Sequence, residues 1–392
     1  MLFQTGVCIF FHETGLCLAY LKSSFRSVKV AGQASYNIES SKGLSEKLKV
    51  AGDYIEDFIH SNRITSPDVF IGIPRELTIL RDVEFPYAVK ENLRSTLEYK
   101  IDNYVPLKNE NIYFDYQIID EDKENNRLRV LIVVVQREVL DSFLILKSRL
   151  GLGLTGIGIS STALVNYFSF HPDTAGEKNY AYVYANHHSL HLGAVKNRIL
   201  QYSRTVSLAD AGNQQDILYR ELKPITDFFS GPPKPINTVI CADKEDNFVS
   251  ETLKADEDYR LVVPVLSRIE THSALMVPAF GLALRGLQKV PVEINLLPPA
   301  IRKRPSRTVY YLMLVLASLF IISGLSWGGS KIMLQRLRLN AINTETERLL
   351  AEIKNIDRIR SDLQKLEDRI EYLERLWRGQ APTLEILREV TE

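Results

Sequence analysis

Residues 308–330 read TVYYLMLVLASLFIISGLSWGGS and contain no charged side chain. About 20 consecutive apolar residues, at 1.5 Å each, cross the roughly 30 Å hydrocarbon core of a bilayer. Tyr310 and Tyr311 lie at one end of the run and Trp327 lies at the other, where amphipathic rings favour the headgroup region. The buried helices of soluble proteins rarely hold so long an apolar run. The stretch therefore predicts one transmembrane helix over residues 308–327.

The charges around this helix bear on its orientation. Basic residues flank both ends, four before it and three after it: Arg302, Lys303, Arg304 and Arg307, then Lys331, Arg336 and Arg338. The more basic side of a span usually faces the cytoplasm. Residues 1–5, MLFQT, lack the basic start and long apolar core of a signal peptide. We therefore expect a single-pass protein with a cytoplasmic N-terminus.

Beyond the membrane helix, apolar residues recur every seven positions, with a second series three positions later. The predicted seam consists of Leu349, Ile356, Ile359, Leu363, Leu366, Ile370, Leu373 and Trp377, and Ile342 extends the first series toward the membrane. A single helix cannot bury such a seam alone. We therefore expect a coiled-coil stalk over residues 328–378, paired with a second copy of this chain or with a different protein.

The stalk is expected to end at residues 379–382, GQAP, because glycine and proline both oppose helix continuation. Residues 383–387, TLEIL, are typical of the start of another helix. Residues 379–392 are too short to fold alone, so a partner or further residues would have to complete them.

The composition excludes some classes of function. The 392 residues include 48 basic and 48 acidic side chains. A balanced charge gives no long-range attraction to a polyanion, so no nucleic-acid partner is expected. The three cysteines are Cys8, Cys17 and Cys241. This sparse, odd count fits a reducing compartment and provides neither a disulfide framework nor a C-x-x-C metal spacing.

Residues 1–287 alternate strand-like and helix-like segments, which is typical of α/β or α+β layering. The predicted strands cover residues 69–73, 128–135, 181–185, 189–195, 199–203 and 238–242, and the predicted helices include residues 89–104 and 137–149. The three consecutive strands between residues 181 and 203 predict an antiparallel meander.

Several short motifs invite a catalytic interpretation. Residues 151–156, GLGLTG, match G-x-G-x-x-G, but they follow a predicted helix and precede a strand, the reverse of the dinucleotide-binding order. His187, His188 and His191 lack a nearby carboxylate or cysteine to complete a zinc site, so a polar turn is favoured. Residues 160–161 are serines outside any G-x-S-x-G elbow. The sequence predicts no catalytic residue, no cofactor site and no metal site.

Three stretches resemble the PilM family of actin-like type IV pilus proteins: PRELTILRDVEFP at 74–86, LEYKIDNYVPL at 97–107 and AFGLALRGL at 279–287. The motif Ile294-Asn295-Leu296-Leu297-Pro298, ahead of a basic patch, a span and a coiled coil, resembles PilN. One chain that joins both has the layout of GspL, the inner-membrane platform protein of type II secretion. The resemblance covers essentially the whole chain.

The GspL resemblance implies an α/β actin-like cytoplasmic domain over residues 1–287 and a linker over 288–307 that carries the motif and the basic patch. The membrane helix and a periplasmic stalk follow. A small ferredoxin-like domain usually ends these families, and residues 379–392 would be its start. The protein would lie in the bacterial inner membrane with its C-terminus in the periplasm.

The chain departs from active actin-like ATPases, in which two β-hairpins carry an aspartate and glycines that hold metal and phosphates. In the matching first hairpin, residues 6–11, Cys8 lies about where the aspartate would be, and Phe10 obstructs the approach that glycine permits. The second, residues 183–186, also lacks aspartate, and the adenosine-loop position reads Ala-Asp-Lys at 242–244. Thiols and phenols are poor ligands for Mg²⁺. We expect a degenerate ATPase fold, without a cofactor and without enzymatic activity.

The resemblance also implies partners. The cytoplasmic half would recruit a GspE/PilB-like assembly ATPase, the stalk would pair with a GspM/PilO-like membrane protein, and a GspF/PilC-like membrane protein would complete the platform. PilM holds the PilN motif in a groove. Here residues 288–293 extend to about 20 Å, so the motif would dock in the same chain or swap into a neighbour, and a solvated linker is the alternative. Other possible functions are a pilus platform, an active actin-like ATPase and a signalling receptor.

Overall fold

The computed structural model describes residues 4–23, 27–38, 43–65, 68–151, 153–186, 189–208, 214–228, 238–242, 248–254, 256, 258–266, 273–302 and 308–389. The chain forms two compact units, residues 1–304 and residues 305–392.

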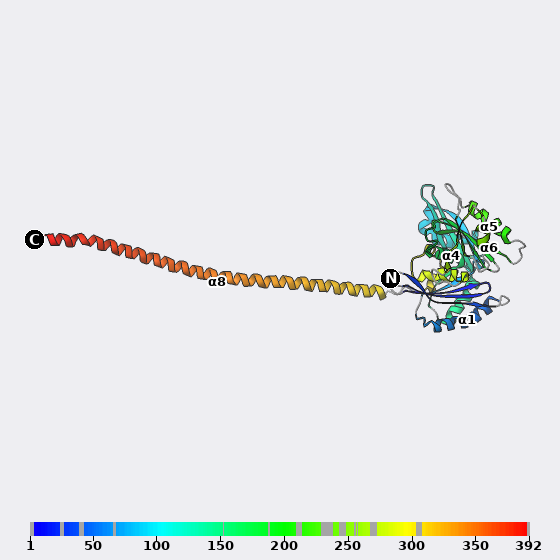
Figure 1. Ribbon diagram of the computed structural model, residues 1–392, viewed down its shortest axis with the longest axis horizontal. Coiled ribbons are helices and arrows are strands. Elements are labelled where there is room, and N and C mark those ends of the chain that lie inside the picture. The colour runs from blue at the N-terminus through cyan, green and yellow to red at the C-terminus, as the bar shows by residue number, and fades with distance from the viewer. Residues whose placement is uncertain are drawn as a thin grey trace. The chain divides into compact units, whose positions relative to one another are not determined.

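The first sheet of the globular unit has the strand order β3-β2-β1-β4-β8. Its first three strands are antiparallel neighbours and its last two run parallel to β1. Its strands are β1 (Thr5–His12), β2 (Gly15–Ser23), β3 (Val28–Asn37), β4 (Asp68–Ile73) and β8 (Leu154–Ile159). Helices α1 (Leu44–Ser61) and α3 (Arg137–Leu150) cover one face, and α4 (Ser160–Phe170) and α7 (Val277–Ala283) cover the other (Figure 1).

The second sheet repeats this plan, with the order β11-β10-β9-β12-β13 and again three antiparallel strands followed by two parallel ones. Its strands are β9 (Tyr180–Ala185), β10 (Ser189–Lys196), β11 (Ile199–Ser207), β12 (Thr238–Ala242) and β13 (Arg260–Val262). Helices α5 (Gln214–Phe228) and α6 (Phe248–Lys254) pack on its outer face. The side chains of a strand alternate between faces. Tyr180, Tyr182 and Tyr184 accordingly join the core shared with the first sheet.

A smaller sheet, with the order β5-β7-β6, is inserted between β4 and β8. Its elements are β5 (Thr78–Pro86), α2 (Leu93–Lys100), β6 (Ile112–Asp122) and β7 (Arg127–Gln136). Strand β7 is buried on both faces. Val130, Ile132 and Val134 pack in the cluster that contains α2, while Leu131 and Val133 join the main core. This double burial explains the unbroken apolar run of β7 and attaches the inserted sheet to the rest of the unit.

Most of the predicted elements are confirmed, including the meander β9-β10-β11 and the strand-to-helix step from β7 to α3. Gly151 ends α3 with a φ of 61°, a left-handed conformation that favours glycine, and residues 154–156 already belong to β8. The single helix predicted over residues 89–104 is wrong. It is divided into the 3₁₀ turns η2 (Tyr87–Asn92) and η3 (Ile101–Asn103) around α2. Asn92 has a φ of −112° and a ψ of 22°, outside the α-helical range, and it separates η2 from α2.

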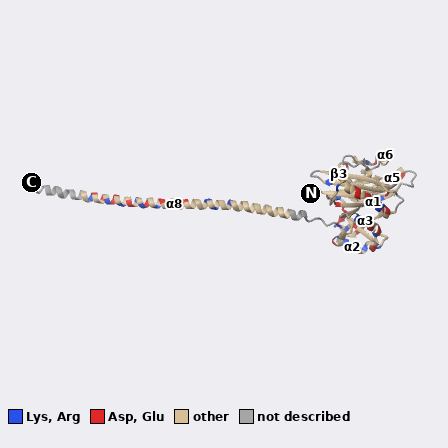
Figure 2. Cartoon of the chain, turned by 90° about the horizontal axis from the view of Figure 1, so that it is seen from below, with Lys and Arg blue, Asp and Glu red and all other residues tan. Residues whose placement is uncertain are grey.

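The second unit is one helix, α8 (Thr308–Glu389), of 82 residues. It contains a window with a mean hydropathy of 1.6 and is a candidate single membrane span. Figure 2 shows that α8 is free of charge in its first described part and carries mixed acidic and basic residues further along. The predicted helix end at residues 379–382 is wrong, because α8 continues to Glu389. One glycine and one proline cost about 1 and 3 kcal/mol in a helix. The turns on both sides can offset that cost.

Candidate functional site

Residues 290–297, here called the strap, form an extended segment at the edge of the first sheet. Its side chains are buried at every second position, a period-two alternation typical of a strand. The side chains of Val290, Val292, Ile294, Leu296 and Leu297 are at most 6% exposed and belong to the main core. The globular unit therefore extends beyond Leu287, where the sequence analysis ended it.

The Asn295 side chain and the backbone of Leu296 join the strap to β8. The Oδ1 atom of Asn295 accepts the N–H of Ile157 at 2.9 Å, and the N–H of Leu296 donates to the Ile157 carbonyl at 2.9 Å. The Nδ2 atom of Asn295 donates to the Thr155 carbonyl at 3.3 Å. Because β8 ends its sheet, the strap pairs with backbone groups at this edge. A Cβ atom at Gly156 would lie 3.0 Å from the Asn295 amide, so glycine provides room for this side chain.

Side chains from other elements pair with the backbone of the strap. Asn166 of α4 donates to the carbonyl of Val292 at 3.1 Å and accepts its N–H at 3.1 Å. Gln117 of β6 donates to the carbonyl of Pro291 at 3.0 Å. Backbone groups that leave water need such partners. The strap is thus held by side chains that are distant in the sequence.

Two arginines donate hydrogen bonds to backbone carbonyls of the motif. Arg285 donates to the carbonyl of Ile294 at 2.7 Å, and its guanidinium lies over the Phe70 ring. Desolvation lowers the pKa of Arg285 to about 10, which leaves the side chain charged at neutral pH. Arg302 donates to the Leu297 carbonyl at 2.8 Å and to the carbonyl of the motif asparagine at 2.9 Å. Arg302 was assigned to the basic patch before the span, but its guanidinium binds the strap.

A carboxylate from the inserted sheet completes the site. The Oδ2 atom of Asp115, on β6, accepts the N–H of Asn295 at 2.7 Å, and its Oδ1 atom lies 3.4 Å from Nη1 of Arg94. Burial raises the pKa of Asp115 above its usual range, although its hydrogen bonds and the nearby Arg302 oppose the shift. Asp115 therefore connects the inserted sheet to the strap.

The sequence analysis named the five motif residues but missed the side chains that hold the strap, which are Asp115, Gln117, Asn166 and Arg285. Asp115 and Gln117 are neighbours on β6, Asn166 lies on α4, and Arg285 belongs to the stretch 279–287 that carried the PilM resemblance, so three separate regions of the sequence hold the strap. One available signal was overlooked: residues 290–296, VPVEINL, alternate apolar and other residues as a strand does.

Comparison with known proteins finds solved structures of similar fold but no matching protein family. No protein-family model matches the sequence, and no curated protein matches it. Among solved structures, a PilM–PilN type IV pilus biogenesis complex aligns at a TM-score of 0.54 and 14% identity, over 73% of this chain and 99% of that one. The cytoplasmic domain of EpsL, an inner-membrane component of the Vibrio cholerae type II secretion system, aligns at 0.46 and 12%, over 76% and 100%. A Bacteroides thetaiotaomicron protein of unknown function with an actin-like ATPase fold aligns at 0.44 and 14%, over 72% and 95%.

The globular unit has an actin-like fold. Its two similar sheets each begin with a hairpin, β1-β2 and β9-β10. These are the hairpins that the sequence analysis matched to the phosphate-binding positions of actin-like ATPases.

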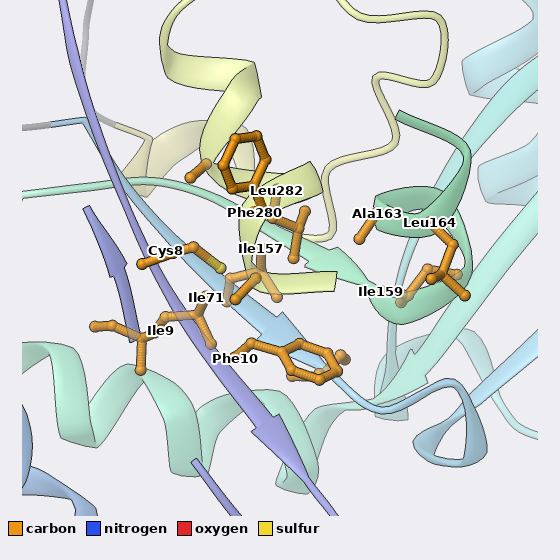
Figure 3. Close-up of a cluster of buried hydrophobic side chains, with 14 of the residues drawn as sticks. Cys8, Ile9, Phe10, Ile71, Ile157, Ile159, Ala163, Leu164, Phe280 and Leu282 are labelled. Atoms are coloured by element: carbon orange, nitrogen blue, oxygen red, sulfur yellow. The ribbon is translucent and has the colours of Figure 1, made fainter. Parts of the chain in front are cut away.

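In the first hairpin, the positions that the sequence analysis matched to the phosphate-binding site of actin-like ATPases are packed in the core. Figure 3 shows Cys8 and Phe10 within an apolar cluster that also holds Phe280 and Leu282 of α7. The Cys8 side chain is fully buried, and burial together with the neighbouring Cys17 thiol raises its pKa well above the usual range. A protonated thiol in an apolar cluster is not a ligand for Mg²⁺.

The second hairpin places tyrosine side chains against the first half of the actin-like fold. Tyr182 and Tyr184 are buried, and burial raises the pKa of both phenols. The Tyr182 hydroxyl donates to Oγ of Ser203 at 3.2 Å, and Ser203 lies 2.6 Å from Oγ of Ser161. Residues 243–244 of the expected adenosine loop lie outside the described residues.

Among the three histidines that suggested a metal site, His187 and His188 lie outside the described residues. His191 is buried, with Oγ of Ser189 at 3.1 Å from one ring nitrogen and Oγ1 of Thr205 at 3.1 Å from the other. Desolvation lowers the pKa of His191 to about 4. In the described part of the chain, no three metal-binding side chains come together. His191 is a hydrogen-bonded core residue there.

A cavity of about 420 Å³ lies at the tips of the hairpins. Its wall is mainly apolar, with Phe11, Leu44 and Phe143, and it also includes the carboxylates of Glu13 and Glu76. Carboxylates oppose the binding of phosphate groups. The basic side chain of Lys47 also lines the cavity, so its charged lining is mixed.

The predicted coiled-coil seam lies along α8 and is exposed within this single chain. The exposed seam residues are Leu349, Ile356, Ile359, Leu363, Leu366, Ile370, Leu373 and Trp377, each at least 54% exposed. A long apolar seam open to solvent is typical of an oligomer interface.

Proposed function

We propose that this chain is a single-pass inner-membrane scaffold of a type II secretion system, with the actin-like unit in the cytoplasm and the stalk in the periplasm. The observation that carries the proposal is the strap. It contains the PilN-like motif, it is buried in an actin-like unit similar to the PilM–PilN complex, and the same chain continues into a membrane-spanning type of helix. Together these features suit a protein that couples two compartments.

The contacts of the strap support a coupling role. Its backbone is bound by Asp115 and Gln117 of the inserted sheet, Ile157 of the first sheet, Asn166 of α4 and Arg285 after α7. A force along the chain from α8 would therefore be shared among several elements of the unit. A solvated linker would transmit no such force.

The secretion and pilus alternatives differ in how many chains they use. The solved structure that aligns at a TM-score of 0.54 is a complex of two named proteins, PilM and PilN, whereas the PilM-like and PilN-like stretches of this protein lie in one chain. A single polypeptide favours the GspL layout. The alternative is a platform protein of type IV pilus assembly.

The partners in this proposal follow from the layout. The cytoplasmic unit would bind the GspE/PilB-like assembly ATPase, and the seam of α8 would pair with a GspM/PilO-like protein. A GspF/PilC-like membrane protein would complete the platform. We also propose that the unit binds no nucleotide, because Cys8 and Phe10 of the first hairpin are packed in the apolar core.

The test of the proposed function is deletion of the gene in its native host, with secretion and surface piliation measured side by side. We expect loss of secretion, restored by the full chain but not by a chain truncated before the stalk. Loss of piliation alone would select the pilus alternative. If neither process changes, the scaffold proposal is wrong.

Orientation and nucleotide binding have separate tests. Alkaline phosphatase fused after residue 345 should be active, since it would lie in the periplasm, and the same enzyme fused at residue 1 should be inactive. Calorimetric titration of the detergent-solubilised full chain with magnesium and ATP should give no heat of binding. Binding with a dissociation constant in the micromolar range would overturn the degenerate-ATPase proposal.

A further inference from the structure

A groove of about 690 Å³ separates two edge strands of the globular unit. Strand β5 ends the inserted sheet, strand β11 ends the second sheet, and the two strands are neighbours in space. Helix α5 forms the third wall. The groove is lined by Leu80, Arg81, Asp82, Gln201, Tyr202, Arg204, Arg220, Glu221, Pro224 and Ile225.

The backbone on both sides of the groove is suited to strand addition. Strand β5 pairs along its full length with β7, and β11 pairs with β10, so within the described residues each strand ends its sheet and has one edge without a strand partner. On β11 the Ser203 carbonyl already accepts a hydrogen bond from Arg75 at 3.1 Å. Edge strands offer N–H and C=O groups to an added strand. Between them the lining includes Leu80, Pro224, Ile225 and the partly exposed Tyr202. An extended peptide would therefore find both hydrogen-bond partners and apolar contacts.

The charged side chains of the groove indicate whether its binding partner should be acidic or basic. Glu221 is shared between Arg204, at 2.9 Å, and Arg220, at 3.4 Å. Asp82 pairs with Arg129, which does not line the groove.

Arg81 bonds to the carbonyl of Leu80 at 3.3 Å, and no carboxylate pairs with it among the described residues. The three lining guanidiniums therefore have one shared carboxylate between them, and the groove carries an excess of positive charge.

We propose that this groove binds an extended segment of a partner protein in which carboxylates alternate with apolar side chains. A strand that is added at a sheet edge directs alternate side chains to opposite faces. One set of side chains would pack on the apolar floor and the other would meet the guanidiniums. Glu221 and Asp82 at the groove oppose a continuous polyanion such as a nucleic acid. The site is independent of the strap and of α8, so it goes beyond the proposed scaffold role.

The probe is a short fluorescein-labelled peptide of alternating Val and Glu, titrated against the detergent-solubilised full chain and followed by fluorescence anisotropy. We expect saturable binding that weakens about tenfold or more in the double variant Arg81→Glu/Arg204→Glu, since two charge-assisted contacts would be replaced by repulsion. Lys100→Glu, which reverses an exposed charge on α2 away from the groove, is the matched control and should bind as the parent does.

Two further peptides separate strand addition from simple charge attraction. A peptide of the same composition, with all its valines before all its glutamates, should bind at least tenfold more weakly. A Val-Glu peptide with alternate N-methylated amides should also lose binding, because it cannot form the ladder. Equal binding of the block peptide, or undiminished binding by the double variant, would overturn the proposal.

The same purified protein can be used to test two other possible occupants of the groove, a nucleic acid and a second copy of this chain. If oligodeoxythymidine binds as tightly as the alternating peptide, the groove is a general anion site and the proposal is wrong. If the peptide does not bind, but the double variant changes the mass of the purified chain in sedimentation, the occupant is a second copy of this chain and the proposal is likewise overturned.

Discussion

The Oδ1 atom of Asn295 accepts the backbone N–H of Ile157 at 2.9 Å, across an interval of 138 residues. The side chain acts as a peptide carbonyl would, because it pairs with the edge strand at a point where the strap does not form a regular ladder. The adjacent bond between Leu296 and the Ile157 carbonyl completes the pairing. This relationship fixes the register of the strap on β8.

Removing this side chain should weaken the docking of the strap. In Asn295→Ala, the N–H of Ile157 loses its partner, and a buried unsatisfied donor costs about 1–3 kcal/mol. Denaturant unfolding of the full chain should show this loss, and hydrogen exchange of the Ile157 amide should accelerate. Asn92→Ala is the matched control, because Asn92 is exposed and its side chain makes no capping bond. Unchanged exchange at Ile157 would contradict the role given to Asn295.

The apolar anchors of the strap give a second prediction. In Leu296→Asp/Leu297→Asp, two side chains that are each 1% exposed become carboxylates. The loss of buried leucine alone costs about 2–5 kcal/mol per site, and burial of charge adds to it. We expect the strap to detach or the unit to unfold, seen as new proteolytic cleavage between residues 288 and 302. Ile145→Asp, at a side chain that is 72% exposed, should leave the cleavage pattern unchanged.

The strap and α8 differ in how well they could be predicted from the sequence. The apolar run at residues 308–330 and the heptads beyond it predict a helix because their signal is local and periodic. The end of that helix was predicted wrongly, because the local cost of Gly379 and Pro382 did not outweigh propagation along the 82-residue helix. A single glycine or proline ends a short helix more reliably than a long one.

The residues that hold the strap cannot be identified from the local sequence around them. Asp115 reads as an ordinary acidic residue of a strand, and Asn166 reads as a polar residue of a short helix. Their roles arise because the chain brings them to residues 292 and 295, more than 120 positions later. The motif could be named from a family resemblance, but the residues that hold it required the fold.

The buried histidine of the second sheet predicts a dependence of stability on pH. The pKa of His191 is about 4 in the folded protein, against 6.5 as its ordinary value. Between these values the unfolded chain binds a proton that the folded chain does not, so stability falls as the pH decreases from about 6.5 to 4. The nearby Arg75 opposes protonation as well, although Glu76 lies 3.7 Å from the ring.

A shift of this size corresponds to about 3 kcal/mol over that interval. His191→Gln should therefore lose much of the acid sensitivity, when unfolding free energies at pH 5 and pH 7.5 are compared. His60→Gln, at an exposed position of α1, is the control. If His191→Gln and the parent lose stability equally on acidification, another group is responsible.

The contribution of Asp115 to stability should depend on pH in the opposite direction to that of His191. Burial raises its pKa, so in the folded protein it takes up a proton at a higher pH than in the unfolded chain. Ionisation of Asp115 therefore costs more in the folded protein than in the unfolded chain, and stability from this group decreases as the pH rises from the ordinary aspartate pKa through the folded pKa. Asp115→Asn keeps an acceptor for the Asn295 N–H without the charge. We expect this variant to gain stability relative to the parent at neutral pH, and to lose that advantage near pH 4, in parallel denaturant titrations. A larger advantage at low pH would contradict this account.

The seam of α8 gives the last prediction, which concerns assembly. Leu363 and Leu366 are 55% and 54% exposed in the single chain, and they occupy the two core positions of one heptad. Leu363→Asp/Leu366→Asp should separate the stalk from its partner, because charges at core positions would have to be buried. Sedimentation of the solubilised chain and cross-linking in native membranes should both show loss of the complex, whether the partner is a second copy or another protein. Gln364→Asp lies next to the seam but outside it and should leave the complex intact. If the double variant leaves both measurements unchanged, the seam does not mediate assembly, and the stalk would need another role.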